Sequence, residues 1–205
     1  MMTTESRVMS ALMSATQVDE PTLARLHASL VARSADEGLL DVGYAFMDSP
    51  IGELMLVSSD AGLLKIAFEN EDFDQVLGDL SVRIGPRILL APQRLQAVEQ
   101  ELCEYFAGTR KHFDLTLDLS LTQGFRQRVQ QHLVEIDYGT TQSYKELAES
   151  VGNPKASRAV GSACASNPLP IVLPCHRVLR SDGSLGGYAG GLDAKRILLA
   201  LEQAA

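Results

Sequence analysis

The chain has 205 residues, of which 45% are hydrophobic and 21% are charged, and this composition excludes an intrinsically disordered protein because a sizeable core can form. The net charge of −8 argues against a nonspecific nucleic-acid-binding protein. The acidity is regional, however: residues 1–119 hold 9 Lys and Arg against 19 Asp and Glu, whereas residues 120–205 hold 9 against 7. The C-terminal part can therefore present a basic face to phosphates.

Signals for export or membrane insertion are missing from the sequence. No apolar run approaches the roughly 20 residues that span a bilayer, and the N-terminus lacks a basic stretch followed by an apolar core. The three cysteines are odd in number and unevenly spaced, which favours reduced thiols over a disulfide framework. We therefore expect a cytoplasmic protein without a membrane partner.

The first part of the chain predicts an extension followed by an α/β domain. Residues 1–18 have no periodicity and are expected to form a leader. The predicted elements that follow are an amphipathic helix over 21–33, a three-stranded antiparallel meander within 43–69, helices over 72–84 and 92–107, and a strand over 112–121. They place an N-terminal extension over residues 1–42 and a domain with a small antiparallel sheet over residues 43–121.

The second part of the chain, residues 122–205, changes to a helical pattern. The predicted helices cover residues 125–136, 143–151 and 155–165, and an apolar helix ends the chain. Ser143, with Glu146 three residues later, has the spacing of a capping box, and residues 152–154 break the helix that it begins. Two helices joined by so short a turn predict a helix-turn-helix, although many such pairs are ordinary structural hairpins.

The stretch PIVLPCHRV, Pro170 through Val178, frames a cysteine with two prolines and an apolar tripeptide. Because prolines fix φ and remove backbone donors, Cys175 is expected at the mouth of a rigid apolar slot. A cysteine attacks as its thiolate, and the adjacent His176 can raise the thiolate fraction through a bridging water. A carboxylate such as Glu202 can orient the imidazole. Alternatively, Cys175 is a buried structural thiol and Glu202 is a surface glutamate.

A glycine-rich stretch, SDGSLGGYAGG over residues 181–191, follows this motif. It predicts either a flexible loop or a loop whose backbone approaches a ligand closely, with Tyr188 as an aromatic wall. No Gly-Lys-Ser/Thr follows, which excludes a phosphate-binding P-loop. The cysteines and the four histidines lack ligand spacing, so we expect neither a metal nor another cofactor.

Taken together, these motifs closely resemble the methylated-DNA–protein-cysteine methyltransferases, also called 6-O-alkylguanine-DNA alkyltransferases. The matching segments are SPIGELML, AGLLKI, EYFAGTRKHFDLTLDL, SYKELAESVGNPKASRAVGSACASNP, PIVLPCHRVLRSDGSLGGYAGGL and LLALE. The resemblance covers about residues 43–205. It implies an α+β protein with a ribonuclease H-like N-terminal α/β domain and a helical, winged helix-turn-helix C-terminal domain that carries the active-site cysteine.

The resemblance also implies a function. An alkyl group at O-6 of guanine, or at O-4 of thymine, in duplex DNA would pass irreversibly to Cys175 after the base is flipped, once per molecule. His176, a water and Glu202 would activate the thiol, which Asn167 would brace. The other implied roles are proton donation to the base by Tyr144, pocket lining by Val178, Tyr188 and Ala189, filling of the DNA stack by Arg158, and DNA contact by Lys145, Asn153 and Ser181. The implied partner is double-stranded DNA with alkylated guanine, bound by a monomer.

The sequence departs from the family at two places. Relatives often carry tryptophan after the valine of the helix over 125–136, where this chain has Gln130 after Val129, and the zinc site of some relatives has no counterpart. From the residues alone, two other functions stay open. One is a helix-turn-helix transcription regulator in which Cys175 is structural or senses alkylation. The other is a cysteine hydrolase, which would need an oxyanion hole that the sequence does not reveal.

Overall fold

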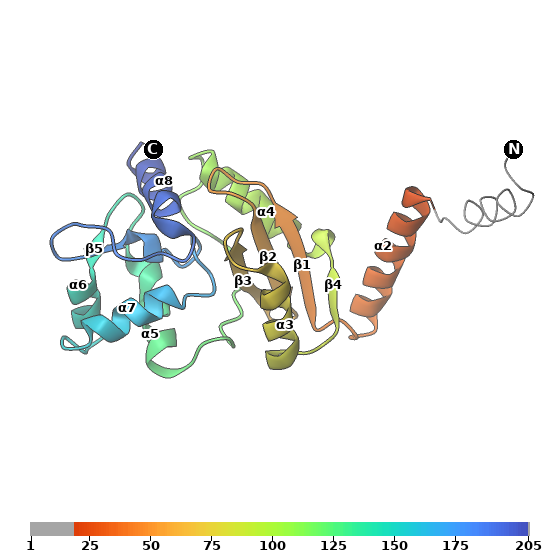
Figure 1. Cartoon of the computed structure of the whole chain (residues 1–205), viewed down its shortest axis with the longest axis horizontal. Helices are drawn as coiled ribbons and strands as arrows, with labels where there is room; N and C mark the ends of the chain where they lie inside the picture. The colour runs from red at the N-terminus through yellow and green to blue at the C-terminus, as the bar shows by residue number, and fades with distance from the viewer. Residues whose placement is uncertain (1–18, 205) are drawn as a thin grey trace, which may run out of the picture. The chain divides into compact units, whose positions relative to one another are not determined.

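The computed structural model describes residues 19–204, and the chain divides into two compact units. The first unit ends at Leu40 and contains α2 (Glu20–Asp36), which confirms the predicted helix and extends it at both ends. The predicted leader over residues 1–18 lies outside the described residues. The second unit, Asp41–Ala205, contains all the other described elements (Figure 1).

The second unit begins with a four-stranded sheet in the order β3-β2-β1-β4. Its strands are β1 (Val42–Met47), β2 (Leu54–Ser59), β3 (Gly62–Phe68) and β4 (Ile88–Leu90). The first three form the predicted antiparallel meander, but β4 pairs in parallel with β1. The sheet is therefore mixed, and the expectation of an antiparallel sheet was wrong. The sequence analysis did not predict β4, because its three consecutive apolar residues show no alternation of apolar and polar side chains.

Different helices cover the two faces of the sheet. Leu54 and Leu56 of β2 point to the face that carries α4 (Pro92–Phe106), whereas Met55 and Val57 point to the face that carries α3 (Phe73–Arg83). Because both faces are buried, this strand is a continuous apolar run. The helix α4 packs between the sheet and the C-terminal part of the unit.

The predicted strand over 112–121 was wrong as a strand. Within the described chain, this segment pairs with the sheet through a single parallel bridge between Leu117 and Leu63. The backbone N–H of Leu63 donates to Thr116 over 2.9 Å, and that of Asp118 donates back to Leu63 over 2.8 Å. Gly62 permits this close approach, because an added Cβ would overlap the Thr116 carbonyl. The alternation of the segment reflects side chains that pack inward, not a full hydrogen-bonded ladder.

The remainder of the unit is helical, as predicted. Its elements are α5 (Gly124–His132), a 3-10 turn (Leu133–Glu135), β5 (Gln142–Ser143), α6 (Tyr144–Ser150), α7 (Ser157–Ala165), a second 3-10 turn (Cys175–Arg177), β6 (Val178–Leu179) and α8 (Gly191–Ala204). The capping box is confirmed, since Oγ of Ser143 accepts from the N–H of Glu146 over 3.1 Å and the Glu146 carboxylate accepts from Ser143 over 2.6 Å. The helices α5, α6 and α7 pack together.

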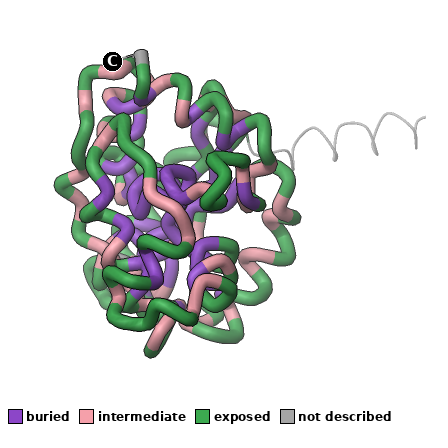
Figure 2. Tube along the Cα trace, turned by 90° about the vertical axis from the view of Figure 1, so that its left-hand side faces the viewer, coloured by how far each residue is buried: buried purple, intermediate pink, exposed green. Residues whose placement is uncertain are grey.

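A buried glutamine joins α5 to α7. Gln130, where relatives often carry tryptophan, is fully buried, and its Nε2 donates to the carbonyl of Ala163 over 3.1 Å. The helical part in turn joins the sheet, because the N–H of Ile66 in β3 donates to the carbonyl of Pro168 over 2.8 Å. One buried cluster joins a face of the sheet and α4 to the helical part, and a second cluster lies between the other face of the sheet and α3. Figure 2 shows the buried residues in purple along the chain.

Candidate active site

The longest buried stretch of the described chain runs from residue 167 to residue 178 and contains the PIVLPCHRV motif. Pro170 and Pro174 are both buried in it. Ile171 has a φ of 74°, in the left-handed region that a β-branched residue rarely adopts, at a cost on the order of 1–3 kcal/mol. The N–H of Cys175 donates to the carbonyl of Leu173 over 2.7 Å. The motif thus fixes the backbone of Cys175, as the prolines suggested.

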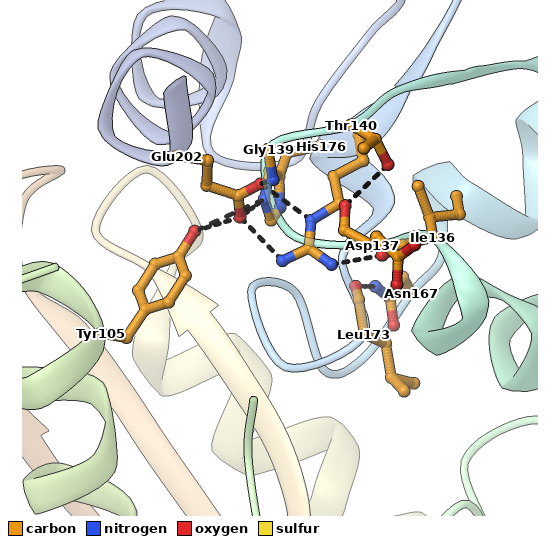
Figure 3. Close-up of polar contacts among 10 residues, drawn as sticks. Tyr105, Ile136, Asp137, Gly139, Thr140, Asn167, Leu173, His176 and Glu202 are labelled. Carbon is orange, nitrogen blue, oxygen red and sulfur yellow. Dashed lines mark hydrogen bonds and ion pairs between the residues drawn. The ribbon is translucent and has the colours of Figure 1, made fainter. Parts of the chain in front are cut away.

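Asn167 links the sulfur to this frame. Its Nδ2 donates to the carbonyl of Leu173 over 2.7 Å (Figure 3). The same nitrogen donates to Sγ of Cys175 over 3.2 Å, and Oδ1 accepts from the N–H of Leu169 over 3.1 Å. The side chain is therefore held at both ends. A donor aimed at sulfur stabilises the thiolate more than the thiol.

Cys175 itself is only 4% exposed. Burial raises the pKa of its thiol above the ordinary value, while the hydrogen bond from Asn167 and the charge of Lys195 oppose the rise. The ammonium of Lys195 is also buried, and it donates to the carbonyl of Val178 over 2.7 Å. A buried thiol of raised pKa needs a base before it can attack.

His176, the next residue in the chain, is the candidate for that base. It is fully buried, and its Nε2 lies 2.8 Å from Oε1 of Glu202. Burial lowers the pKa of the imidazole, and this effect outweighs the attraction of the carboxylate. The ring is therefore neutral near pH 7, with its proton on Nε2, where the carboxylate accepts it. Nδ1 has no hydrogen-bond partner in the described part of the chain, so its lone pair is available.

The carboxylate of Glu202 is buried at the centre of a polar cluster (Figure 3). It accepts from His176, from the hydroxyl of Tyr105 over 2.7 Å, from two nitrogens of Arg177 over 2.9 Å each, and from the N–H of Gly139 over 3.2 Å. Burial alone would raise the pKa of Glu202, but the hydrogen bonds from His176, Arg177 and Tyr105 lower it to about 2. Glu202 is thus a permanent anion in the interior and not a surface glutamate.

Sequence reasoning missed Tyr105 in this cluster and Lys195 near Cys175. Tyr105 belongs to an amphipathic helical pattern that predicts only packing, and nothing local relates it to a residue almost a hundred positions later. Arg177 follows the Cys-His pair and was expected only as a basic neighbour of the thiol, not as a partner of Glu202. In the structure it is 6% exposed and donates to the carbonyl of Ile136 over 2.5 Å.

The predicted pocket residues lie around the same motif. Tyr144, at the start of α6, is half-buried, and the glycine loop passes so close that an added Cβ on Gly186 would overlap its hydroxyl. Val178 is fully buried, and the ring of Tyr188 lies 6.4 Å from that of His176. The carbonyl of Ala189 accepts from Asn70 over 2.8 Å. The glycine-rich loop is therefore held against the site. This position is compatible with the prediction that its backbone approaches a ligand closely.

The predicted DNA-contacting residues are all exposed. Lys145 lies on α6, Asn153 lies in the turn between α6 and α7, Arg158 lies on the first turn of α7, and Ser181 begins the glycine loop. Lys145 makes only a long ion pair of 3.9 Å with Glu149. Their positions leave these side chains accessible to a large ligand.

The described residues contain neither a metal-binding cluster nor a membrane-spanning helix. Among residues 19–204, no group of three or more His, Cys, Asp and Glu side chains could hold a metal ion. No helix in that range is long and apolar enough to cross a bilayer.

Comparison with known proteins gives a consistent result. Residues 42–119 match the ribonuclease-like domain of 6-O-methylguanine DNA methyltransferase, and residues 124–204 match its DNA binding domain. The chain is 40% identical over 159 residues to the methylated-DNA–protein-cysteine methyltransferase of Methanosarcina acetivorans, covering 78% of this chain and 97% of the relative. It is 38% identical over 164 residues to the constitutive enzyme of that name from Bacillus subtilis, covering 78% and 94%.

A solved structure supports the same assignment. Mycobacterium tuberculosis OGT in complex with DNA superposes with a TM-score of 0.70 at 38% identity, over 79% of this chain and 93% of that one. The two matched domains together account for most of the chain, and they include the sheet, every described helix after α2 and every residue of the polar cluster around Glu202. This protein belongs to the 6-O-methylguanine DNA methyltransferase family.

Proposed function

We propose that this protein is a methylated-DNA–protein-cysteine methyltransferase that transfers methyl and larger alkyl groups from O-6 of guanine in double-stranded DNA to Sγ of Cys175. The observation that carries the proposal is the buried series Asn167, Cys175, His176 and Glu202, in which an anion orients a neutral imidazole beside a thiol that Asn167 contacts. The same chemistry extends to O-4 of alkylated thymine.

The reaction begins with loss of the thiol proton. A water bridges Sγ and Nδ1 of His176, and the imidazole takes up the proton while Glu202 stabilises the resulting cation. The thiolate attacks the alkyl carbon in line, the new S–C bond forms as the C–O bond breaks, and the electron pair passes to the guanine. The hydroxyl of Tyr144 supplies the proton that the leaving base requires, and the proton held by His176 then returns through solvent to the Tyr144 oxygen, so the charges balance.

Because the thiol is buried, the alkylated base has to leave the DNA duplex to reach it. An O-6 lesion lies inside the base stack, so the nucleotide is flipped out at a cost of a few kcal/mol. The pocket lined by Val178, Tyr188 and Ala189 receives the base. Arg158, on the first turn of α7, fills the vacated stack. Lys145, Asn153 and Ser181 contact the DNA backbone, consistent with their exposure.

Some consequences follow from the product. A thioether has no hydrolytic exit, so each molecule acts once, as a monomer and without a cofactor. The thiol must stay reduced, which suits the cytoplasm. We further assign residues 43–121 to a ribonuclease H-like domain and residues 122–205 to a winged helix-turn-helix domain, with α6 and α7 as the helix pair and β5 and β6 at the wing. Residues 1–42 form an extension outside both.

Incubation with duplex DNA that carries a labelled O-6-methylguanine tests the proposal. The label should move to the protein, and peptide mapping should place it on Cys175 with at most one label per molecule. Cys175→Ala should abolish transfer while leaving affinity for the duplex largely unchanged, because the thiol supplies chemistry and not contacts. A wild-type chain that binds the duplex but takes no label would point to a regulator, and release of free methanol would point to hydrolysis.

A further inference from the structure

One hydroxyl group in the polar cluster comes from the sheet-and-helix part of the unit, far from the motif in sequence. Tyr105, in the last turn of α4, is fully buried. It donates to Oε1 of Glu202 over 2.7 Å, which is the same oxygen that His176 contacts, and its own oxygen lies 3.5 Å from Nε2 of His176. Figure 3 shows Tyr105 reaching Glu202 from the side opposite to Asn167.

The ring and the hydroxyl of Tyr105 have separate partners. Its ring centroid lies 5.5 Å from that of Phe106, 5.4 Å from that of Phe113 and 6.1 Å from that of Tyr138. These contacts fix the ring whether or not a hydroxyl is present. Burial, followed by the negative charge of Glu202, raises the pKa of Tyr105 far above its ordinary value. The hydroxyl therefore stays protonated and can only donate to the carboxylate.

The donors on Glu202 are divided between its two oxygens. Arg177 contacts both oxygens, Gly139 contacts Oε2, and Tyr105 and His176 meet at Oε1. Tyr105 holds Oε1 at the imidazole. We propose that Tyr105 is a positioning residue for the transfer reaction, which fixes the Glu202 carboxylate so that His176 keeps its proton on Nε2 and presents Nδ1 to the thiol.

This inference rests on the proposed alkyl transfer and predicts a pH-dependent effect. The charged and titratable groups around His176 are Glu202 and Lys195 from α8, Tyr105 from α4, Tyr188 from the glycine loop, and its chain neighbours Cys175 and Arg177. Loss of the Tyr105 hydroxyl makes Oε1 a stronger acceptor for the imidazolium, which raises the pKa of His176. Transfer requires the neutral imidazole, so the acid limb of the rate profile moves to higher pH.

The test compares the wild-type full chain with Tyr105→Phe across pH 4 to 9, using the second-order rate constant of methyl transfer from duplex DNA. The acid limb should shift upward by about one pH unit, which is about tenfold in rate on its acid side and is typical of one lost hydrogen bond to a charged group. The matched control is Tyr138→Phe, because Tyr138 lies in the same aromatic cluster and its buried hydroxyl has no partner in the described chain. Its profile should equal that of the wild type.

Three results would overturn the inference. These are an unchanged profile for Tyr105→Phe, an equal loss at every pH accompanied by lower thermal stability, or an identical shift in Tyr138→Phe. If Tyr105→Phe fails to fold, 3-fluorotyrosine at position 105 keeps the ring and strengthens the donor, and the limb should then move to lower pH; no movement would again refute the role. A wild-type protein that transfers no methyl group would instead refute the proposed function itself.

Discussion

Two buried charges of the site form an ion pair. Glu202 contributes its negative charge and Arg177 its positive charge, Lys195 is a further buried cation near Cys175, and His176, Tyr105 and Cys175 are neutral at rest. A buried ion pair adds little net stability compared with apolar residues, but removal of one partner leaves an uncompensated charge and costs several kcal/mol. The cluster therefore serves to orient His176, and its members depend on one another.

The Glu202 carboxylate gives the fold a defined acid sensitivity. Its pKa of about 2 lies below the ordinary 4.5, so it stabilises the folded state by roughly 3 kcal/mol above pH 4.5, and this contribution is lost as the pH falls from about 4.5 to 2. Glu202→Gln should be less stable than the wild type at pH 7 and should approach it as the pH falls. Urea unfolding of both proteins between pH 7 and pH 3 measures this difference. A difference that is constant across the range would contradict the assignment.

How much of the site the sequence predicts depends on local spacing. Cys175 and His176 are adjacent in the chain, and their motif predicted them together, whereas the role of Asn167 came from the family resemblance. Glu202 was only a candidate, because one carboxylate on a terminal helix looks like any surface charge. The bonds from Tyr105 and Arg177 to Glu202 could not be found in this way, since they exist only once α8 packs against α4 and the motif.

At the scale of elements, the glycine loop joins two parts of the site. Gly186 packs against Tyr144, and Gly190 packs so closely against Phe68 of β3 that an added Cβ would lie 2.7 Å from its ring. Glycine is required at such contacts because any side chain would displace the neighbour. The loop thereby spans from α6 to the sheet.

Gly186→Ala should slow methyl transfer at least tenfold, because its Cβ would displace the Tyr144 hydroxyl or push the loop off the site. The neighbouring Gly187→Ala is the matched control: nothing lies within 4 Å of its added Cβ, and neither glycine has a positive φ. Single-turnover rates of both variants on a methylated duplex decide the question. Equal rates for the two variants would show that close packing at residue 186 does not matter for transfer.

The helix α7 carries the next prediction. Arg158→Ala should slow repair of duplex DNA far more than attack on free O-6-methylguanine, because filling the vacated stack matters only where a stack exists. The loss should be on the order of the few kcal/mol that flipping costs, and each 1.4 kcal/mol or so is about tenfold in rate. Saturating single-turnover rates on both substrates measure it.

Lys155→Ala provides the control for charge, since Lys155 is an exposed cation three residues earlier. It should weaken duplex binding without changing the saturating rate. Equal slowing of Arg158→Ala on duplex and free base would show that Arg158 supports the pocket instead of the DNA stack.

The predictions for residues 112–121 and for β4 were wrong for the same physical reason. Periodicity reports which side of a segment is buried, but not whether its backbone pairs. Residues 112–121 alternate because they pack on the core, yet they pair with β3 only at Leu117. Conversely, β4 pairs fully with β1 over three residues that show no alternation. Helices were predicted better, because caps such as Ser143 with Glu146 are local.

At the scale of the whole molecule, the two matched domains form one functional body. The hydrogen bond from Ile66 to Pro168, the contact of Phe68 with Tyr188 and the bond from Tyr105 to Glu202 all join the sheet region to the helical region. The helical region contains Cys175, and the sheet region supplies Phe68 and Tyr105, which contact Tyr188 and Glu202. The sheet region therefore helps to build the candidate site.

This organisation predicts how the chain tolerates truncation. A protein of residues 41–205 should keep its thermal stability and transfer methyl groups within about twofold of the full-length rate, because the sheet, the helices and the polar cluster all lie inside Asp41–Ala205. The leucines of α2 are about half exposed, and Val31 is the one hydrophobic residue that is buried among the described residues of this helix. Residues 122–205 alone should lose transfer, since they lack Tyr105 and the β3 contacts with Pro168 and Tyr188. Thermal unfolding and label transfer should be measured for both truncated proteins. A marked loss of rate in the protein of residues 41–205 would contradict the prediction and would assign residues 1–40 a role in the reaction.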